Sequence, residues 1–247
     1  MDCHYAAMSS FTNTRIVDTF KTKLEDEWTR TPKCQVHTEC DYCLPPFIST
    51  TSLKQWMDRK DGGDSESNGK RVLDEVNAIK WVPFLSSDLV FEGGNRCVLV
   101  LGCLLKQDQG RLIYLFRKAN VLDRNLSKPE FNYQPLRAEL THYKAKYNIG
   151  DVDAIIKDFE DNKWAFCPAH LDGERGDEKD FGKKLLLPFC TRSLVNDKGG
   201  TASVTQVTVP KEYVSDEIKN HLGKPFEFGE YGEVSTIGLI RFVEYFI

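Results

Sequence analysis

The 247-residue chain lacks the features that direct proteins to membranes or nucleic acids. No stretch approaches the roughly 18 consecutive apolar residues of a membrane span. Residues 1–10 lack the basic start and apolar run of a secretory signal, and we expect them to be disordered. No block of Lys and Arg stands out in a chain of net charge −4, so the sequence gives no sign of the basic patch that binds nucleic acids. We therefore expect a cytoplasmic or nuclear protein with no membrane or nucleic-acid partner.

Recognisable catalytic motifs are missing as well. The chain contains no G-x-S-x-G, H-E-x-x-H, Walker or dinucleotide-binding fingerprint. Cys167 and His170 are close in sequence, but a nucleophilic pair also needs an orienting group and an oxyanion site, and neither is recognisable. We interpret Cys167, with Cys97, Cys103 and Cys190, as small core residues that are thiols in a reducing compartment.

What the chain does have is enough apolar sequence for a sizeable core, with 40% hydrophobic and 11% aromatic residues. Helical spacing of these residues occurs in five segments, at 16–28, 52–58, 71–80, 136–147 and 152–159. The continuous apolar runs at 97–105 and 111–116 suit buried strands, although periodicity alone does not separate a strand from a buried helix. Residues 29–51, 61–70 and 172–180 are predicted to be loops. The mixture predicts an α+β fold.

One cluster has the residue types of a metal site. Cys34, His37, Cys40 and Cys43 follow one another at three-residue steps, and thiolates and imidazole are the ligands of tetrahedral zinc. Structural zinc sites normally use two separated ligand pairs, however, and four ligands within ten residues are cramped. We therefore expect no zinc, and a zinc-stabilised adaptor stays as an alternative that metal analysis would decide.

A more specific order of features begins at residue 153. A helix is followed by Lys163-Trp164-Ala165-Phe166-Cys167-Pro168, then Leu185-Leu186-Leu187-Pro188-Phe189, a polar glycine-bearing stretch, and the β-favouring run 205–210. This order resembles the fungal-type serine/threonine protein kinases, in which a Leu-Pro-Phe element leads into the glycine-rich loop of the small lobe. The resemblance implies an N-terminal α+β domain over residues 11–184 and an antiparallel remnant of a kinase small lobe over 185–247. A fungal source is implied by the resemblance alone.

The glycine-rich loop of a kinase joins two antiparallel strands over the ATP phosphates. The resemblance places Gly199, Gly200 and Val204 at nucleotide-binding positions, while Asp197 and Ala202 stand where glycines are expected. A glycine pair before a Val/Thr strand also fits an ordinary hairpin. Glycine allows backbone amides to approach phosphate, so ATP with magnesium is expected only if the resemblance is functional.

The catalytic parts of a kinase do not follow. No Ala-x-Lys, His-Arg-Asp or Asp-Phe-Gly element occurs after Pro210, so a phosphate-gripping lysine, a base and metal ligands are missing. We expect no catalytic residues, no cofactor, and a kinase-related, non-catalytic protein that acts by binding a protein partner or by regulation. The alternative is a piece of an active kinase whose catalytic lobe lies elsewhere; a downstream reading frame with those motifs would favour it.

The C-terminal tail, residues 234–247, departs from the kinase pattern. It is rich in β-favouring apolar residues without strict alternation, which places apolar groups on both faces of a strand. The tail either closes the remaining sheet or stays exposed and self-associates. We favour the exposed tail, and expect its removal to raise solubility with little change in melting temperature.

Overall fold

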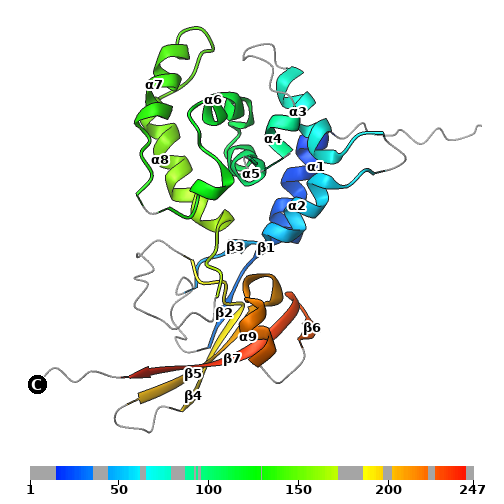
Figure 1. The fold of residues 1–247 in the computed structure, drawn as a ribbon, viewed down its shortest axis with the longest axis vertical. Coiled ribbons are helices and arrows are strands. Elements are labelled where there is room, and N and C mark those ends of the chain that lie inside the picture. Colours follow the sequence, from blue (N-terminus) through cyan, green and yellow to red (C-terminus); the bar gives the residue numbers. More distant parts are fainter. Residues whose placement is uncertain are drawn as a thin grey trace, which may run out of the picture.

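The computed structural model describes residues 15–35, 44–61, 65–78, 87–91, 93, 96–128, 130–171, 186–196, 202–221 and 226–242. Helices fill the first two thirds of the chain and most strands gather near the C-terminus (Figure 1). The predicted α+β class is therefore confirmed. The predicted disorder of residues 1–10 and the loop at 172–180 lie outside the described residues.

The helices are α1 (Ile16–Lys23), α2 (Thr50–Asp58), α3 (Asn68–Ala78), α4 (Ser87–Phe91), α5 (Val98–Lys106), α6 (Ile113–Lys118), α7 (Gln134–Tyr143), α8 (Val152–Asn162) and α9 (Asp216–His221). The strands are β1 (Thr29–Arg30), β2 (Lys33–Cys34), β3 (Phe47–Ile48), β4 (Thr191–Asn196), β5 (Ala202–Pro210), β6 (Glu227–Gly229) and β7 (Gly232–Phe242). The predicted loop at 29–51 thus contains three short strands, and the predicted loop at 61–70 ends in the first turn of α3, where Asn68 and Gly69 are buried.

The first predicted helix is confirmed in an unusual form. α1 continues into a π turn, Leu24–Trp28, and the apolar residues Phe20, Leu24 and Trp28 are buried. A spacing of four residues drifts around a regular α-helix of 3.6 residues per turn. The wider π turn corrects this drift. The correction brings Trp28 against Phe20, with ring centroids 5.4 Å apart.

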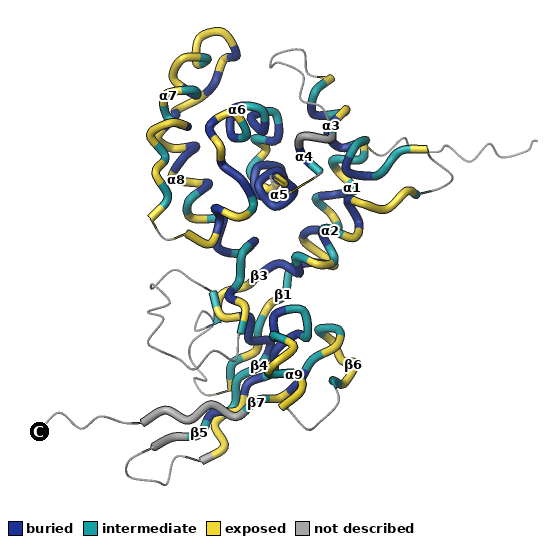
Figure 2. The backbone as a smooth tube through the Cα atoms, in the orientation of Figure 1, coloured by how far each residue is buried: buried dark blue, intermediate teal, exposed yellow. Residues whose placement is uncertain are grey.

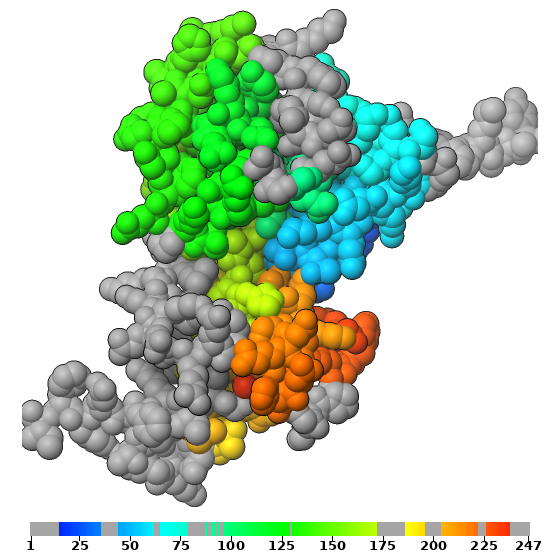
Figure 3. Space-filling model, viewed as in Figure 1, coloured from blue at the N-terminus to red at the C-terminus, as the bar shows by residue number. Residues whose placement is uncertain are grey.

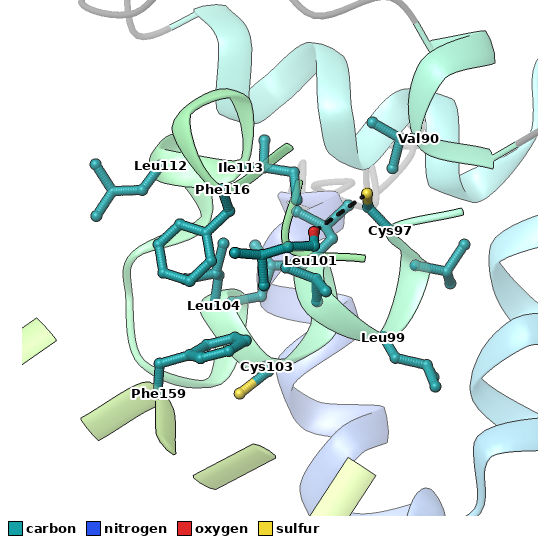
Figure 4. Close-up of a cluster of buried hydrophobic side chains, with 14 of the residues drawn as sticks. Val90, Cys97, Leu99, Leu101, Cys103, Leu104, Leu112, Ile113, Phe116 and Phe159 are labelled. Carbon is teal, nitrogen blue, oxygen red and sulfur yellow. Dashed lines mark hydrogen bonds between the residues drawn. The ribbon is translucent and has the colours of Figure 1, made fainter. Parts of the chain in front are cut away.

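The strand favoured for the run at 97–105 is wrong, and the buried helix that periodicity left open is confirmed: the run forms α5. All eight residues from Val98 to Leu105 are buried, and side chains surround the helix (Figure 4). A helix that is covered all round shows no amphipathic period. The Asp123 carboxylate stabilises its first turn by accepting the amides of Val98, Leu99 and Val100 at 3.0, 2.9 and 3.1 Å.

The strand prediction for residues 111–116 is also wrong. They form a short 3₁₀ turn followed by α6, and Ile113, Leu115 and Phe116 are buried. Phe116 lies against Phe159 of α8 with ring centroids 4.8 Å apart (Figure 4). The helices predicted near 136–147 and 152–159 are α7 and α8.

The five-stranded sheet has the order β2-β4-β5-β7-β6. β2 runs parallel to β4, and the other neighbours are antiparallel. The expectation of an exposed tail is wrong over residues 234–242, because β7 lies between β5 and β6 and pairs with β5 over nine positions; the rest of the predicted tail, residues 243–247, lies outside the described residues. β7 pairs with β5 although its apolar and polar residues do not alternate. The lack of alternation was therefore not a sign of an exposed tail.

The two outer strands of this sheet approach each other at one end. Lys33 Nζ in β2 lies 2.8 Å from Glu230 Oε2, next to β6, and Tyr231 OH donates to Thr31 O at 3.2 Å. The sheet is therefore strongly curled, and the curl encloses a second, smaller core.

Two clusters of buried side chains result. The larger extends from Phe20 to Phe166 among the helices, and the smaller contains Phe47, Phe189, Cys190, Val207, Val209, Tyr213 and Val214. The adjacent residues Phe47 and Ile48 of β3 belong to different clusters because successive strand residues face opposite ways. Figures 2 and 3 show the helical part lying against the sheet part. The predicted boundary at 184/185 falls outside the described residues, but N-terminal sequence contributes β2 to the five-stranded sheet and Phe47 to the smaller core.

Candidate functional site

The predicted nucleotide-binding segment connects two antiparallel strands. Gly199 and Gly200 lie outside the described residues, in the connection between β4 and β5. Val204 lies in β5, is half-buried, and pairs with Asn196 on one side and Ile240 of β7 on the other. The hairpin expected from the sequence is thus present, and Val204 stands near its tip.

The face of the sheet that carries Val204 is polar. Register partners in an antiparallel sheet share a face, which groups Val204 with Gln206 and Thr208 of β5, and with Thr191 and Ser193 of β4. Thr191 and Thr208 are joined by a hydroxyl hydrogen bond of 2.5 Å, and Gln206 is exposed. This face can donate and accept hydrogen bonds to a bound molecule.

Charge is scarce on that face. By register, the cation beside it is Lys33 of β2, which pairs with Thr191. The Lys33 ammonium is held by Glu230, whose hydrogen bond is the main cause of its raised pKa. The opposite face carries Val207 and Val209 into the smaller core. The polar face therefore suits a neutral or weakly charged ligand better than a triphosphate.

A second polar site lies at the junction of helices and sheet. The 3₁₀ turn Lys211–Tyr213 follows β5 directly and reaches the start of α2. Glu212 accepts from Ser49 Oγ at 2.8 Å and from the Thr51 amide at 3.0 Å. A carboxylate is favoured at this position because the first amides of a helix have no intrahelical acceptor and the helix dipole is positive there.

Tyr213 completes this junction. Its buried hydroxyl donates to Ile48 O at 2.8 Å and accepts from the Thr50 amide at 3.1 Å. Its ring lies edge-on against Phe47, with centroids 5.7 Å apart. Burial raises the pKa of the Tyr213 hydroxyl, so it stays a donor at neutral pH. Glu212 and Tyr213 together hold the sheet to α2, and we call these two residues the junction clasp.

An open groove of about 400 Å³ lies beside the junction clasp. Its lining includes both signs of charge, with Arg30, Lys211 and Lys219 beside Glu212 and Glu233. Most of these charges are engaged: Lys211 with Glu233 at 2.9 Å, and Lys219 with Asp216 at 2.9 Å. Such a lining can bind polar groups.

We expect the junction clasp to contribute measurably to stability. Replacing Glu212 with Ala leaves the Ser49 hydroxyl and the Thr51 amide without their acceptor, and should lower the free energy of unfolding by about 1–3 kcal/mol. Tyr213→Phe should cost about 1–2 kcal/mol. Urea denaturation of the two single variants and the double variant measures both losses and their coupling. Losses below about 0.5 kcal/mol in both single variants would show that the helices and sheet do not depend on these contacts.

The described residues do not show the four candidate metal ligands together. Cys34 lies in β2 and is half-buried, while His37, Cys40 and Cys43 lie outside the described residues. Among the residues that the structure covers, no group of three or more His, Cys, Asp or Glu side chains is placed to hold a metal ion. The expectation of no zinc and the alternative of a zinc-stabilised adaptor therefore both stay predictions from sequence.

The core interpretation of the apolar cysteines fits their surroundings. Cys97, Cys103 and Cys190 are buried and Cys167 is half-buried. Burial raises the pKa of the Cys97, Cys167 and Cys190 thiols to about 12, so they are protonated at neutral pH and are poor nucleophiles. Cys167 Sγ donates to Lys163 O at 3.2 Å.

Sequence reasoning missed a buried charged cluster around Lys163. This lysine is fully buried, donates to Lys128 O at 3.1 Å, and lies 3.0 Å from Glu160 Oε2. Glu160 also accepts the hydroxyl of Tyr133, and the Lys163 ammonium lies 4.6 Å from the centre of the Trp164 ring. These partners offset the free-energy cost of burying the Lys163 ammonium. None of these residues lines the groove at the junction.

The fold and these sites define an α+β protein with a helical part and a curled five-stranded sheet that presents a polar face. Comparison with known proteins adds no relative: no family model, no curated protein and no solved structure matches the chain. Among the described residues, no helix combines the length and the apolar character that crossing a bilayer requires.

Proposed function

We propose that this chain is a kinase-related protein that acts by binding or regulation and does not transfer phosphate. The observation that carries the proposal is the composition of β7. In the kinase pattern that the sequence resembles, the strand after the glycine-rich hairpin carries Ala-x-Lys on the nucleotide face. β7 lies beside β5, and its register places Thr236, Gly238 and Ile240 on the face of Val204.

Arg241 is the only cation of β7. Arg241 pairs with Ser203 rather than with Val204, and β7 contains no lysine. A triphosphate on the polar face would therefore lack the lysine that grips it in a kinase. The junction clasp supports a regulatory role, since it ties the sheet to the helical part.

We expect the purified chain to transfer no phosphate from ATP. Radiolabelled ATP with magnesium should label neither the chain itself nor a generic protein substrate above the level of a mock purification. A Val204→Asp variant, which places a negative charge on the same face, should give the same background. Labelling above background that is lost in Val204→Asp would contradict the proposal and favour the alternative of an active kinase fragment. Labelling that persists in the variant comes from a contaminant.

A further inference from the structure

The groove beside the junction clasp is lined by residues from separate parts of the chain. Arg30 comes from β1, Thr51 and Ser52 from the first turn of α2, Lys219 from α9, and Tyr231 from the turn between β6 and β7. These elements meet where the helical part joins the sheet part (Figure 1). A groove of about 400 Å³ has the size of sites that hold small molecules.

Arg30 reaches this groove with most of its hydrogen-bonding capacity unused. In the β1–β3 pair it is the register partner of Phe47, so the two side chains share a face, and the Phe47 ring lies against Tyr213. Arg30 Nη1 donates to Glu27 O at 2.7 Å, and no carboxylate among the described residues forms an ion pair with Arg30. A guanidinium has five N–H donors, so a fork of donors remains for a ligand.

The other charges of the lining are already engaged. Lys211 pairs with Glu233, and Lys219 pairs with Asp216. Both oxygens of Glu212 accept hydrogen bonds at the start of α2. Within the described part of the chain, Arg30 is therefore the one cation of the lining that has no carboxylate partner.

This arrangement favours a singly charged ligand group. The planar guanidinium fork matches a carboxylate, whose two oxygens can accept parallel N–H bonds. A doubly charged group would lie near the carboxylates of Glu212 and Glu233 with only one unpaired cation to balance it. Like charges at such short range repel each other.

Hydroxyl groups extend the site beyond Arg30. Thr51 is exposed, and its hydroxyl has no hydrogen-bond partner among the residues that the structure covers. Ser52 Oγ accepts from Ser49 Oγ at 2.8 Å, which leaves the hydrogen of the Ser52 hydroxyl to donate. These groups suit polar substituents of a ligand.

We propose that the groove beside the junction clasp binds a small polar carboxylic acid, whose carboxylate is held by the Arg30 guanidinium. The proposal rests on the lining of the groove and does not depend on the kinase resemblance. The anchor is a single, partly exposed ion pair, so acetate, the simplest probe, should bind with a dissociation constant on the order of 10 mM. N-acetylglycine, which adds an amide, should bind about fivefold more tightly because the hydroxyls can bond to it.

Arginine Nε–H resonances of the full chain provide the measurement. Acetate is titrated at constant ionic strength and about pH 6, where it is ionised, and the Arg30 signal is identified by its loss in Arg30→Gln. We expect a saturable shift of this signal. Arg124 is the matched control, because it is exposed, lies outside the groove, and has no ion pair with any described residue; its signal should not saturate.

Two variants separate the shape of the guanidinium from its charge. Arg30→Lys keeps the charge but loses the fork, so acetate should bind several-fold more weakly, and Arg30→Gln should abolish binding. The backbone amides of Thr51 and Ser52 report binding in these variants, and circular dichroism checks that they fold. If neither variant folds, the comparison of Arg30 with Arg124 in the wild type still tests the site.

The sulfate ion, which is doubly charged at this pH, distinguishes the two kinds of anion. It should bind no more tightly than acetate. Tighter binding of sulfate would overturn the assignment to a carboxylate, and equal binding of acetate and N-acetylglycine would overturn the polar body of the ligand. The absence of a saturable shift at Arg30, an equal response at Arg124, or binding that persists in Arg30→Gln would overturn the site itself.

Discussion

Removal of residues 234–247 will destabilise the curled sheet. β7 is an inner strand that joins β5 to β6, and Val234 and Ile237 pack against the smaller core. Losing these residues separates β6 from the sheet, exposes the long edge of β5, and uncovers apolar surface. At about 25 cal/mol per Å², the loss amounts to several kcal/mol, which corresponds to a fall in melting temperature of about 10 °C or more.

Differential scanning calorimetry measures this change, and truncation at residue 242 is its control, because it keeps every described residue of β7. The control should melt close to the full chain. An unchanged melting temperature together with higher solubility in the longer truncation would mean that β7 does not support the sheet, which is the outcome that sequence alone had predicted.

Asp123→Ala will weaken the larger core. Its carboxylate accepts three consecutive amides at the start of α5, and the alanine variant leaves these amides without an acceptor in a buried setting. We expect the free energy of unfolding to fall by about 2–4 kcal/mol. Burial raises the pKa of the Asp123 carboxyl, while the amide hydrogen bonds act in the opposite direction.

Urea denaturation of Asp123→Ala and Asp123→Asn gives the test. Asparagine keeps one acceptor oxygen and should lose less stability than alanine. If alanine costs under 0.5 kcal/mol, or no more than asparagine, the carboxylate does not hold the first turn of α5. Loss of helical signal with little change in strand signal would locate the damage in the helical part.

Amphipathic segments were predictable and fully buried ones were not. Periodicity located α2, α7 and α8 because each shows one apolar face to the core. It failed for α5, whose central Gly102 is so closely surrounded that an added Cβ would lie 3.1 Å from Phe166 and 3.2 Å from Leu53. A helix that is apolar on all sides gives a continuous apolar run in the sequence, as a buried strand also does. The deciding contact comes from Asp123, more than twenty residues away.

The candidate site was predictable only where its contacts are local in the sequence. The glycine pair and the Val/Thr run indicated the β4–β5 hairpin, since hairpins are local. The junction clasp was not foreseen, because Glu212 and Ser49 are separated by 163 residues and nothing in either local sequence points to the other. Lys163 was treated as part of a kinase-like motif, and besides the neighbouring Glu160 its buried ammonium contacts Lys128 and Tyr133 from an earlier segment.

The position of Phe47 and Ile48 in two different cores has a consequence for synthesis on the ribosome. Ile48 can join the larger core once residues up to Phe166 have emerged. Phe47 must wait for Tyr213, and Tyr213 OH bonds to Ile48 O across a separation of 165 residues. Tyr213 follows Phe166, the last residue of the larger core, by 47 residues, which at ordinary rates of translation is a delay of roughly 2–10 s. The helical part can therefore fold first and hold β3 in place with Phe47 exposed. The strands that emerge later can then pack against this aromatic ring.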